Sequence, residues 1–168
     1  WLWLGLVMGS PAWSASPLER WDPPAWGPLS SHLGLGHAAG RIADDQRVVA
    51  IGPHFFTPGP DGELGTADDV RMRWYGINVA GVAAFPTADN ARQLARTLAS
   101  WGFNAVRIHY IDAPPHPDPA VVNSVLGDGP YPTFNPVAIE RLRHLLAELR
   151  DHGLYVQLNP IAAYTLRP

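Results

Sequence analysis

Two hydrophobic periods alternate along the second half of the chain. Residues 73–79, 103–109 and 154–159 show the period of two that is typical of strands, and the helical period occurs between them. Thr87 and Asn135 stand where they can cap the two helices. Strands that alternate with helices in this way predict an α/β fold whose parallel strands are joined by right-handed crossovers.

Each predicted helix has an apolar stripe and ends at a glycine, Gly102 in the first and Gly153 in the second, and Pro136 takes the first position of the second helix. The stripes consist of Ala91, Leu94, Ala95, Leu98 and Trp101 in the first helix, and of Ile139, Leu142, Leu145, Leu146 and Leu149 in the second. We expect these residues to pack against the sheet.

The three predicted strands each have an aliphatic face and a more polar face. The aliphatic faces carry Tyr75, Ile77, Val79, Val106, Ile108, Tyr110, Val156 and Leu158; the opposite faces carry Trp74, Gly76, Asn78, Ala105, Arg107, His109, Tyr155, Gln157 and Asn159. A doubly wound sheet would show continuous aliphatic runs. One polar face instead favours part of a (β/α)8 TIM barrel, whose site opens at the strand C-termini. No G-x-G-x-x-G motif follows a strand, which weakens a dinucleotide-binding alternative.

The pattern predicts the N-terminal portion of such a barrel, with about three of its strands, within residues 71–168. Because a partial barrel leaves a parallel edge unpaired, we expect the chain to be a fragment of a longer protein. Residues 17–70 precede the barrel portion as a small β-rich region, with β segments predicted at residues 41–43, 48–51 and 54–57.

Residues 1–16 begin with an apolar run and continue with small residues around Ser14 and Ser16. This pattern predicts a secretory signal peptide that begins mid-signal, because the initiator Met and the cationic start are missing. The run is too short to span a bilayer as a helix. The protein is then secreted or periplasmic and has no membrane segment after cleavage; a buried N-terminal strand or helix is the alternative.

Composition excludes several chemistries. The chain has 168 residues and a formal charge of −3, all twelve of its cationic residues are arginine, and it has no cysteine. Without lysine there is no Schiff base or Walker-type phosphate loop, and without cysteine there is no thiol nucleophile or thiolate metal site. No basic stripe indicates a nucleic-acid partner, and no motif indicates a cofactor. The oligomeric state cannot be inferred from these features.

Several motifs together resemble the cellulase-like glycoside hydrolases of family 5 and related retaining (β/α)8 enzymes. The motifs are Arg73-Trp-Tyr-Gly-Ile-Asn-Val79, Phe85-Pro86 and Trp101-Gly-Phe-Asn-Ala-Val-Arg-Ile-His109, followed by Phe134-Asn-Pro136 and Gly153-Leu-Tyr-Val156. The resemblance covers about residues 70–160. It implies hydrolysis of β-glycosidic bonds in a polysaccharide or oligosaccharide by two carboxylates, through a covalent glycosyl-enzyme intermediate.

In that family both carboxylates are glutamates on the fourth and seventh strands, so the resemblance implies that no catalytic acid lies in this sequence. Glu140 and Glu148 fall on the polar face of the second predicted helix, and Glu19 and Glu63 precede the barrel portion. We therefore expect these four to be solvated surface charges, and we expect the chain alone to be inactive.

The resemblance implies that five residues lie on the substrate-binding side of the barrel. Arg107 matches the family's second-strand arginine, whose guanidinium would keep the nucleophile ionised, although a structural ion pair is the alternative. His109 could donate to a sugar hydroxyl or be structural. Asp112 could orient His109, accept from a sugar or form a turn. Asn78 and Asn159 end their strands facing inward and could contact substrate or satisfy local backbone groups.

The sequence also allows other interpretations. Tyr110, Trp74 and Tyr155 could stack on sugars or pack in the core. The protein could be a noncatalytic carbohydrate-binding barrel. It could also be a metal-dependent hydrolase using His109, Asp112 and His116, although their spacing matches no ligand motif. The loop at residues 58–69 could bind calcium through Asp61, Asp68 and Asp69, or could be a solvated hairpin tip.

Overall fold

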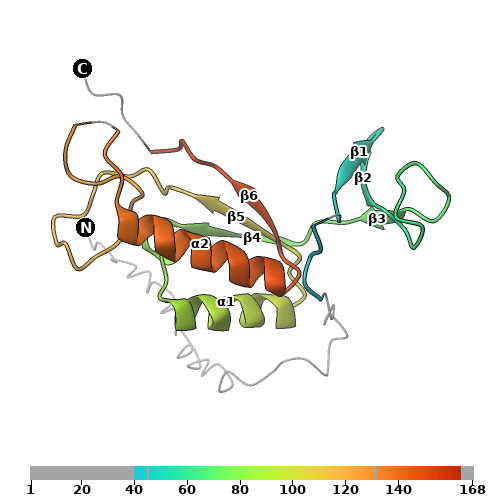
Figure 1. The fold of residues 1–168 in the computed structure, drawn as a ribbon, viewed down its shortest axis with the longest axis horizontal. Helices are drawn as coiled ribbons and strands as arrows, with labels where there is room; N and C mark the ends of the chain where they lie inside the picture. Colours follow the sequence, from blue (N-terminus) through green and yellow to red (C-terminus); the bar gives the residue numbers. More distant parts are fainter. Residues whose placement is uncertain (1–39, 45, 131, 164–168) are drawn as a thin grey trace, which may run out of the picture.

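The computed structural model describes residues 40–44, 46–130 and 132–163 (Figure 1). Its elements in chain order are β1 Val49–Ile51, β2 His54–Thr57, β3 Val70–Met72, β4 Gly76–Ala80, the 3₁₀ helix η2 Gly81–Ala84, α1 Ala88–Ser100, β5 Ala105–His109, α2 Pro136–Asp151 and β6 Tyr155–Leu158. The predicted signal peptide and Glu19 lie outside these residues. None of the helices within them is long and apolar enough to cross a membrane.

The second half of the chain forms a parallel sheet with the strand order β4-β5-β6, which confirms the predicted α/β fold. Gly76 pairs with Ala105 and Ala105 with Tyr155, so neighbouring strands start level with one another. Both helices lie on the same side of this sheet (Figure 1). We call the opposite side, which carries Asn78 and Arg107, the open face.

The core lies between the sheet and the two helices. It consists of Val79, Ala84, Phe85, Ala91, Ala95, Leu98, Val106, Ile108, Ile111, Val122, Ala138, Leu142, Leu145, Leu149 and Leu154. Most of the predicted helical stripe is therefore confirmed. The prediction that Ile139 belongs to the buried stripe is wrong, because Ile139 is exposed. Ala138 is buried in its place, since the face of α2 that meets the sheet begins one residue earlier.

Both predicted caps are present. The side chain of Asn135 accepts hydrogen bonds from the N–H groups of Val137 at 3.0 Å and Ala138 at 3.2 Å, and Pro136 follows as the first residue of α2. Thr87 caps α1 through a longer bond of 3.5 Å from the N–H of Asn90. Gly102 and Gly153 follow the helices with φ of 81° and 76°, conformations that a side chain would strain.

An ion pair joins the two helices. Arg92 of α1 donates from its Nε to a carboxylate oxygen of Glu148 on α2 at 3.2 Å, and Glu148 is mostly shielded from solvent. The expectation that Glu148 is a solvated surface charge is therefore wrong, because helix packing brings it against α1. Glu140 is more exposed and pairs with Arg143 within its own helix.

Ile42, near the first described residue, lies against the C-terminal end of α2. The sequence predicts a β segment at residues 41–43, which is wrong. The backbone of Ile42 instead bonds to Arg150: its N–H donates to the Arg150 carbonyl at 3.0 Å, and its carbonyl accepts from the Arg150 Nε at 2.9 Å. The last carbonyls of a helix need partners, and Ile42 supplies one here.

A second, antiparallel sheet has the order β1-β2-β3. Thr57 pairs with Val70, so residues 58–69 form the tip of a hairpin, as one of the two alternatives predicts. The carboxylates of this tip accept hydrogen bonds from within the loop. The hydroxyl of Thr66 and the N–H of Asp61 donate to Asp68 and hold its pKa below the ordinary range.

The first strand of the parallel sheet begins at Gly76, later than the predicted residue 73. The side chain of Asn104 explains the difference: its Oδ1 accepts from the Tyr75 N–H at 2.8 Å and its Nδ2 donates to the Arg73 carbonyl at 2.6 Å. The alternation predicts Tyr75 in the core with Ile77, which is wrong. Its ring stacks on Phe103 with centroids 4.5 Å apart, and it remains exposed.

Candidate functional site

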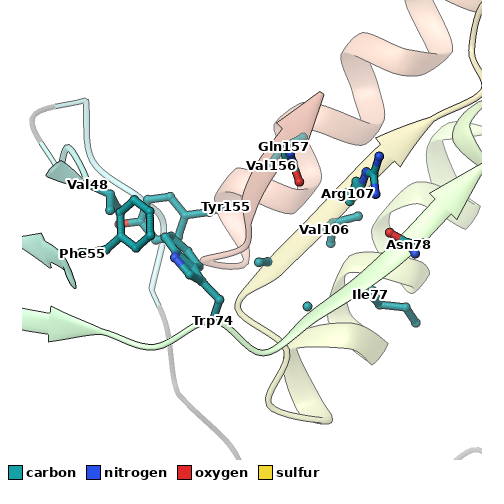
Figure 2. Close-up of a pocket in the computed structure, with 12 residues that line it drawn as sticks. Val48, Phe55, Trp74, Ile77, Asn78, Val106, Arg107, Tyr155, Val156 and Gln157 are labelled. Atoms are coloured by element: carbon teal, nitrogen blue, oxygen red, sulfur yellow. The ribbon is translucent and has the colours of Figure 1, made fainter. Parts of the chain in front are cut away.

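Three polar side chains form a row across the open face of the parallel sheet. The register pairs Asn78 with Arg107 and Arg107 with Gln157, so each strand contributes one member. All three are exposed, and Figure 2 shows them on adjacent strands. The alternation of the sequence predicts that Asn78 and Arg107 lie on one face, which is confirmed.

The row forms one end of a pocket of about 700 Å³ on the open face (Figure 2). The pocket is lined by Val48, Phe55, Trp74, Gly76, Ile77, Asn78, Ala105, Val106, Arg107, Tyr155, Val156 and Gln157. Gly76 and Ala105 pair in register, and their small size leaves the hollow between the polar row and the aromatic residues.

Aromatic rings form the other end of the pocket. Trp74 lies between Phe55 and Tyr155, with ring centroids 5.9 Å and 5.4 Å apart and both pairs edge to face. Phe55 comes from β2, so these contacts join the antiparallel sheet to the parallel sheet. Burial raises the pKa of the Tyr155 phenol above its ordinary value near 10.

Arg107 is the only charged side chain among the described residues that line the pocket. Within the described part of the chain it makes no hydrogen bond or ion pair, so the structural ion pair that the sequence left open is not found there. A guanidinium in mostly apolar surroundings favours a carboxylate or another oxygen acceptor beside it. This end of the pocket can therefore bind and orient an anion.

His109 and Asn159 lie beyond the pocket, at the C-terminal ends of β5 and β6. His109 pairs with Ala80 in the register, and its ring meets Tyr110 edge to face at 5.8 Å. The backbone N–H of Asn159 donates to the Ile108 carbonyl at 2.8 Å, which continues the pairing of the strands. The structure thus places the His109 and Asn159 positions at the same edge of the sheet.

Asp112 is almost fully buried, at 3% exposure. Its two oxygens accept hydrogen bonds from the backbone N–H groups of Ala162 and Ala163 at 2.8 to 3.0 Å. These contacts tie the loop after β5 to the loop after β6. They make Asp112 a structural anchor for the edge of the sheet at which His109 and Asn159 lie.

Within residues 40–44, 46–130 and 132–163, no group of three His, Asp or Glu side chains could hold a metal ion. His116 is engaged elsewhere, because its Nδ1 accepts from the Asp118 N–H at 3.0 Å. The combination of His109, Asp112 and His116 is therefore not brought together. The same finding covers Asp61, Asp68 and Asp69 in the hairpin tip.

Sequence reasoning does not single out Gln157 or Phe55 as site residues. The alternation places Gln157 on the polar face, but its alignment with Arg107 depends on the strand register, which the sequence alone does not specify. Phe55 reaches the pocket from a separate sheet, and no local pattern signals that contact. Trp74 and Tyr155, which the sequence leaves between sugar stacking and core packing, both line the pocket.

A scan against protein-family models and searches of curated proteins and of solved structures find no match to this chain.

Proposed function

We propose that this chain forms the first part of the (β/α)8 barrel of a secreted glycoside hydrolase that cleaves β-glycosidic bonds with retention of configuration. The observation that supports the proposal most is the exposed row of Asn78, Arg107 and Gln157 in a pocket with aromatic walls. Amide and guanidinium groups hydrogen-bond to sugar hydroxyls or to a catalytic carboxylate, and aromatic rings pack against the C–H faces of sugars.

The polar open face supports the barrel. Each strand lies beside the next one in the sequence, and both helices cover the same face. One βαβαβ half of a doubly wound sheet has the same winding, but helices cover both faces of that sheet and its strands carry apolar residues on both sides. The row of Asn78, Arg107 and Gln157 is instead suited to a face that lines the interior of a barrel.

Arg107 is the proposed orienting group for the nucleophile. A carboxylate from a strand outside these 168 residues would accept hydrogen bonds from the guanidinium, which keeps the carboxylate ionised and ready to attack the anomeric carbon. A second carboxyl group, about 5–5.5 Å from the first in retaining enzymes, would protonate the leaving oxygen and then activate water. His109 and Asn159 are the proposed hydroxyl-binding residues.

One observation favours a second candidate, a noncatalytic carbohydrate-binding barrel: no acidic side chain lines the described part of the pocket. Such a protein would use the same polar row and aromatic rings to hold a sugar chain without cleaving it. It predicts binding without turnover by the full-length protein, and this difference separates the two candidates.

The test uses the full-length protein and a panel of aryl β-glycosides and β-linked oligosaccharides. We expect hydrolysis of at least one member, with a first-formed product of β configuration by proton NMR. The 168-residue chain alone is the matched control, and it should give no rate above a buffer blank because the proposal places both catalytic carboxylates outside these residues. Product of inverted configuration, or turnover by the control, would contradict the proposal; binding without turnover would favour the second candidate.

A further inference from the structure

Tyr110 has an unusual backbone conformation, with φ of +60°. It is the one residue other than glycine with a positive φ among the residues that the structure describes; the seven others are glycines. A side chain in this left-handed region brings its Cβ close to the following carbonyl oxygen, and glycine avoids that strain. A bulky aromatic residue at such a position is uncommon.

The turn at Tyr110 changes which residues enter the core. Val106 and Ile108 are buried, and an uninterrupted strand would bury Tyr110 next, as the alternation predicts. That prediction is wrong. Ile111 and Asp112 are buried instead, and Tyr110 is 51% exposed. The left-handed turn therefore lets the chain bury its anchor residues while the Tyr110 ring stays at the surface.

Glycine could make the same turn without strain and without an exposed ring. Backbone strain that persists beside a candidate site is an indication of function. The Tyr110 ring also has a defined position, edge to face with His109 at 5.8 Å. Both rings lie at the C-terminal end of β5, the edge at which ligands bind in sheets of parallel strands.

We propose that Tyr110 is a substrate-contacting residue that contributes to specificity: its ring packs against the C–H face of a pyranose, beside a hydroxyl group that His109 binds. This inference rests on the proposed function and adds a named residue to it. It also explains the strain, because the ring has to face the ligand instead of the core.

The experiment compares Tyr110→Gly, Tyr110→Phe and the wild type in the full-length protein. We expect Tyr110→Gly to raise Tm by roughly 2–4 °C, since glycine relieves the strain of the left-handed turn. We expect the same change to lower kcat/KM by at least about tenfold on the best β-linked pentasaccharide among cello-, manno- and xylopentaose, mainly through KM. Tyr110→Phe keeps the ring and is expected to stay within about threefold of the wild type.

Tyr75→Ala is the matched control, because Tyr75 is similarly exposed but lies at the opposite end of the sheet. Its kcat/KM should equal that of the wild type. If Tyr110→Gly lowers Tm, or raises Tm without changing kcat/KM, the role of Tyr110 is overturned and the proposed function stands. If the wild type neither binds nor cleaves any member of the panel of aryl β-glycosides and β-linked oligosaccharides, both the proposed function and the role of Tyr110 are overturned.

Discussion

The carboxylate of Asp112 accepts hydrogen bonds from the backbone N–H of Ala163, at 2.9 and 3.0 Å, although the two residues lie 51 positions apart in the chain. Asp112 follows β5 and Ala163 follows β6. The bond therefore links the two loops that leave the C-terminal edge of the parallel sheet. A buried carboxylate that binds backbone N–H groups is a strong local constraint, because its hydrogen bonds are charge-assisted.

We predict that Asp112→Asn lowers the free energy of unfolding by about 2 kcal/mol, because the uncharged amide oxygen is a weaker acceptor than the carboxylate and the amide NH₂ replaces an oxygen that accepts from a backbone N–H. Urea denaturation measures the change. Asp118→Asn is the matched control: Asp118 is exposed and accepts from the Ala120 N–H at 2.9 Å, so the same substitution should cost less than about 1 kcal/mol. Equal losses at the two positions would show that Asp112 is not an anchor.

Arg107→Lys should keep the charge of the polar row but lose the planar fork that binds a carboxylate through two hydrogen bonds. In the full-length protein we expect kcat/KM to fall by at least about tenfold, equivalent to ~1.4 kcal/mol of transition-state stabilisation. Arg96→Lys is the matched control, because Arg96 is an exposed residue of α1 that does not line the pocket, and it should leave kcat/KM unchanged.

The stability of the Arg107→Lys variant separates function from structure. Its Tm should move much less than that of Ile108→Ala, which removes core packing from the neighbouring position on the opposite face of β5. Unfolding of the lysine variant, or unchanged turnover, would assign Arg107 a structural role.

Tyr155 makes stability depend on pH in the alkaline range. Because burial raises its pKa in the folded state, the folded protein holds the phenolic proton more tightly than the unfolded chain does. Its contribution is therefore complete below about pH 10, the ordinary pKa of a tyrosine, and is lost as the pH rises through the folded-state pKa. Tyr155→Phe should flatten the fall in stability above about pH 10, measured by urea denaturation at several pH values, whereas an unchanged slope would contradict the assignment.

The two helix caps differ in strength. Asn135→Ala should lower the free energy of unfolding by about 1 kcal/mol, because two N–H groups at the start of α2 lose their acceptor. Thr87→Ala should cost less, since its one bond is 3.5 Å long. Thermal denaturation of both variants gives the comparison, and a larger effect at Thr87 would count against it.

If the predicted signal peptide is present, the full-length protein is secreted with a new N-terminus, which tests the prediction. Cleavage after Ser14 or Ser16 leaves Ala15 or Pro17 as the first residue, and N-terminal sequencing identifies it directly. A secreted protein that begins before Trp13 would contradict the prediction.

Local rules are sufficient to predict the α/β class and the ends of the two described helices. Thr87, Asn135, Gly102 and Gly153 mark the helix ends through the backbone groups they satisfy or the turns they allow, and these signals depend on neighbours in the sequence. The alternation of apolar and polar residues likewise places Asn78 and Arg107 on one face of the sheet, because successive side chains of a strand point to opposite sides.

The remaining features depend on contacts between distant segments. The side chain of Asn104 binds the backbone of Arg73 and Tyr75, so β4 begins only at Gly76. Glu148 pairs with Arg92 only when α1 and α2 pack together. Tyr110 leaves the alternating pattern because a left-handed turn brings Ile111 into the core. No periodicity in the sequence signals these events, since each depends on which segments meet in the folded chain.

The strand order has a consequence for the way the protein is made. In both described sheets every strand pairs with the strand next to it in the sequence, so no strand has to insert between two earlier ones. A chain that leaves the ribosome from its N-terminus can therefore add β5 to β4 and then β6 to β5, and each new strand finds its partner already synthesised. The parallel sheet can grow by addition at one edge during translation.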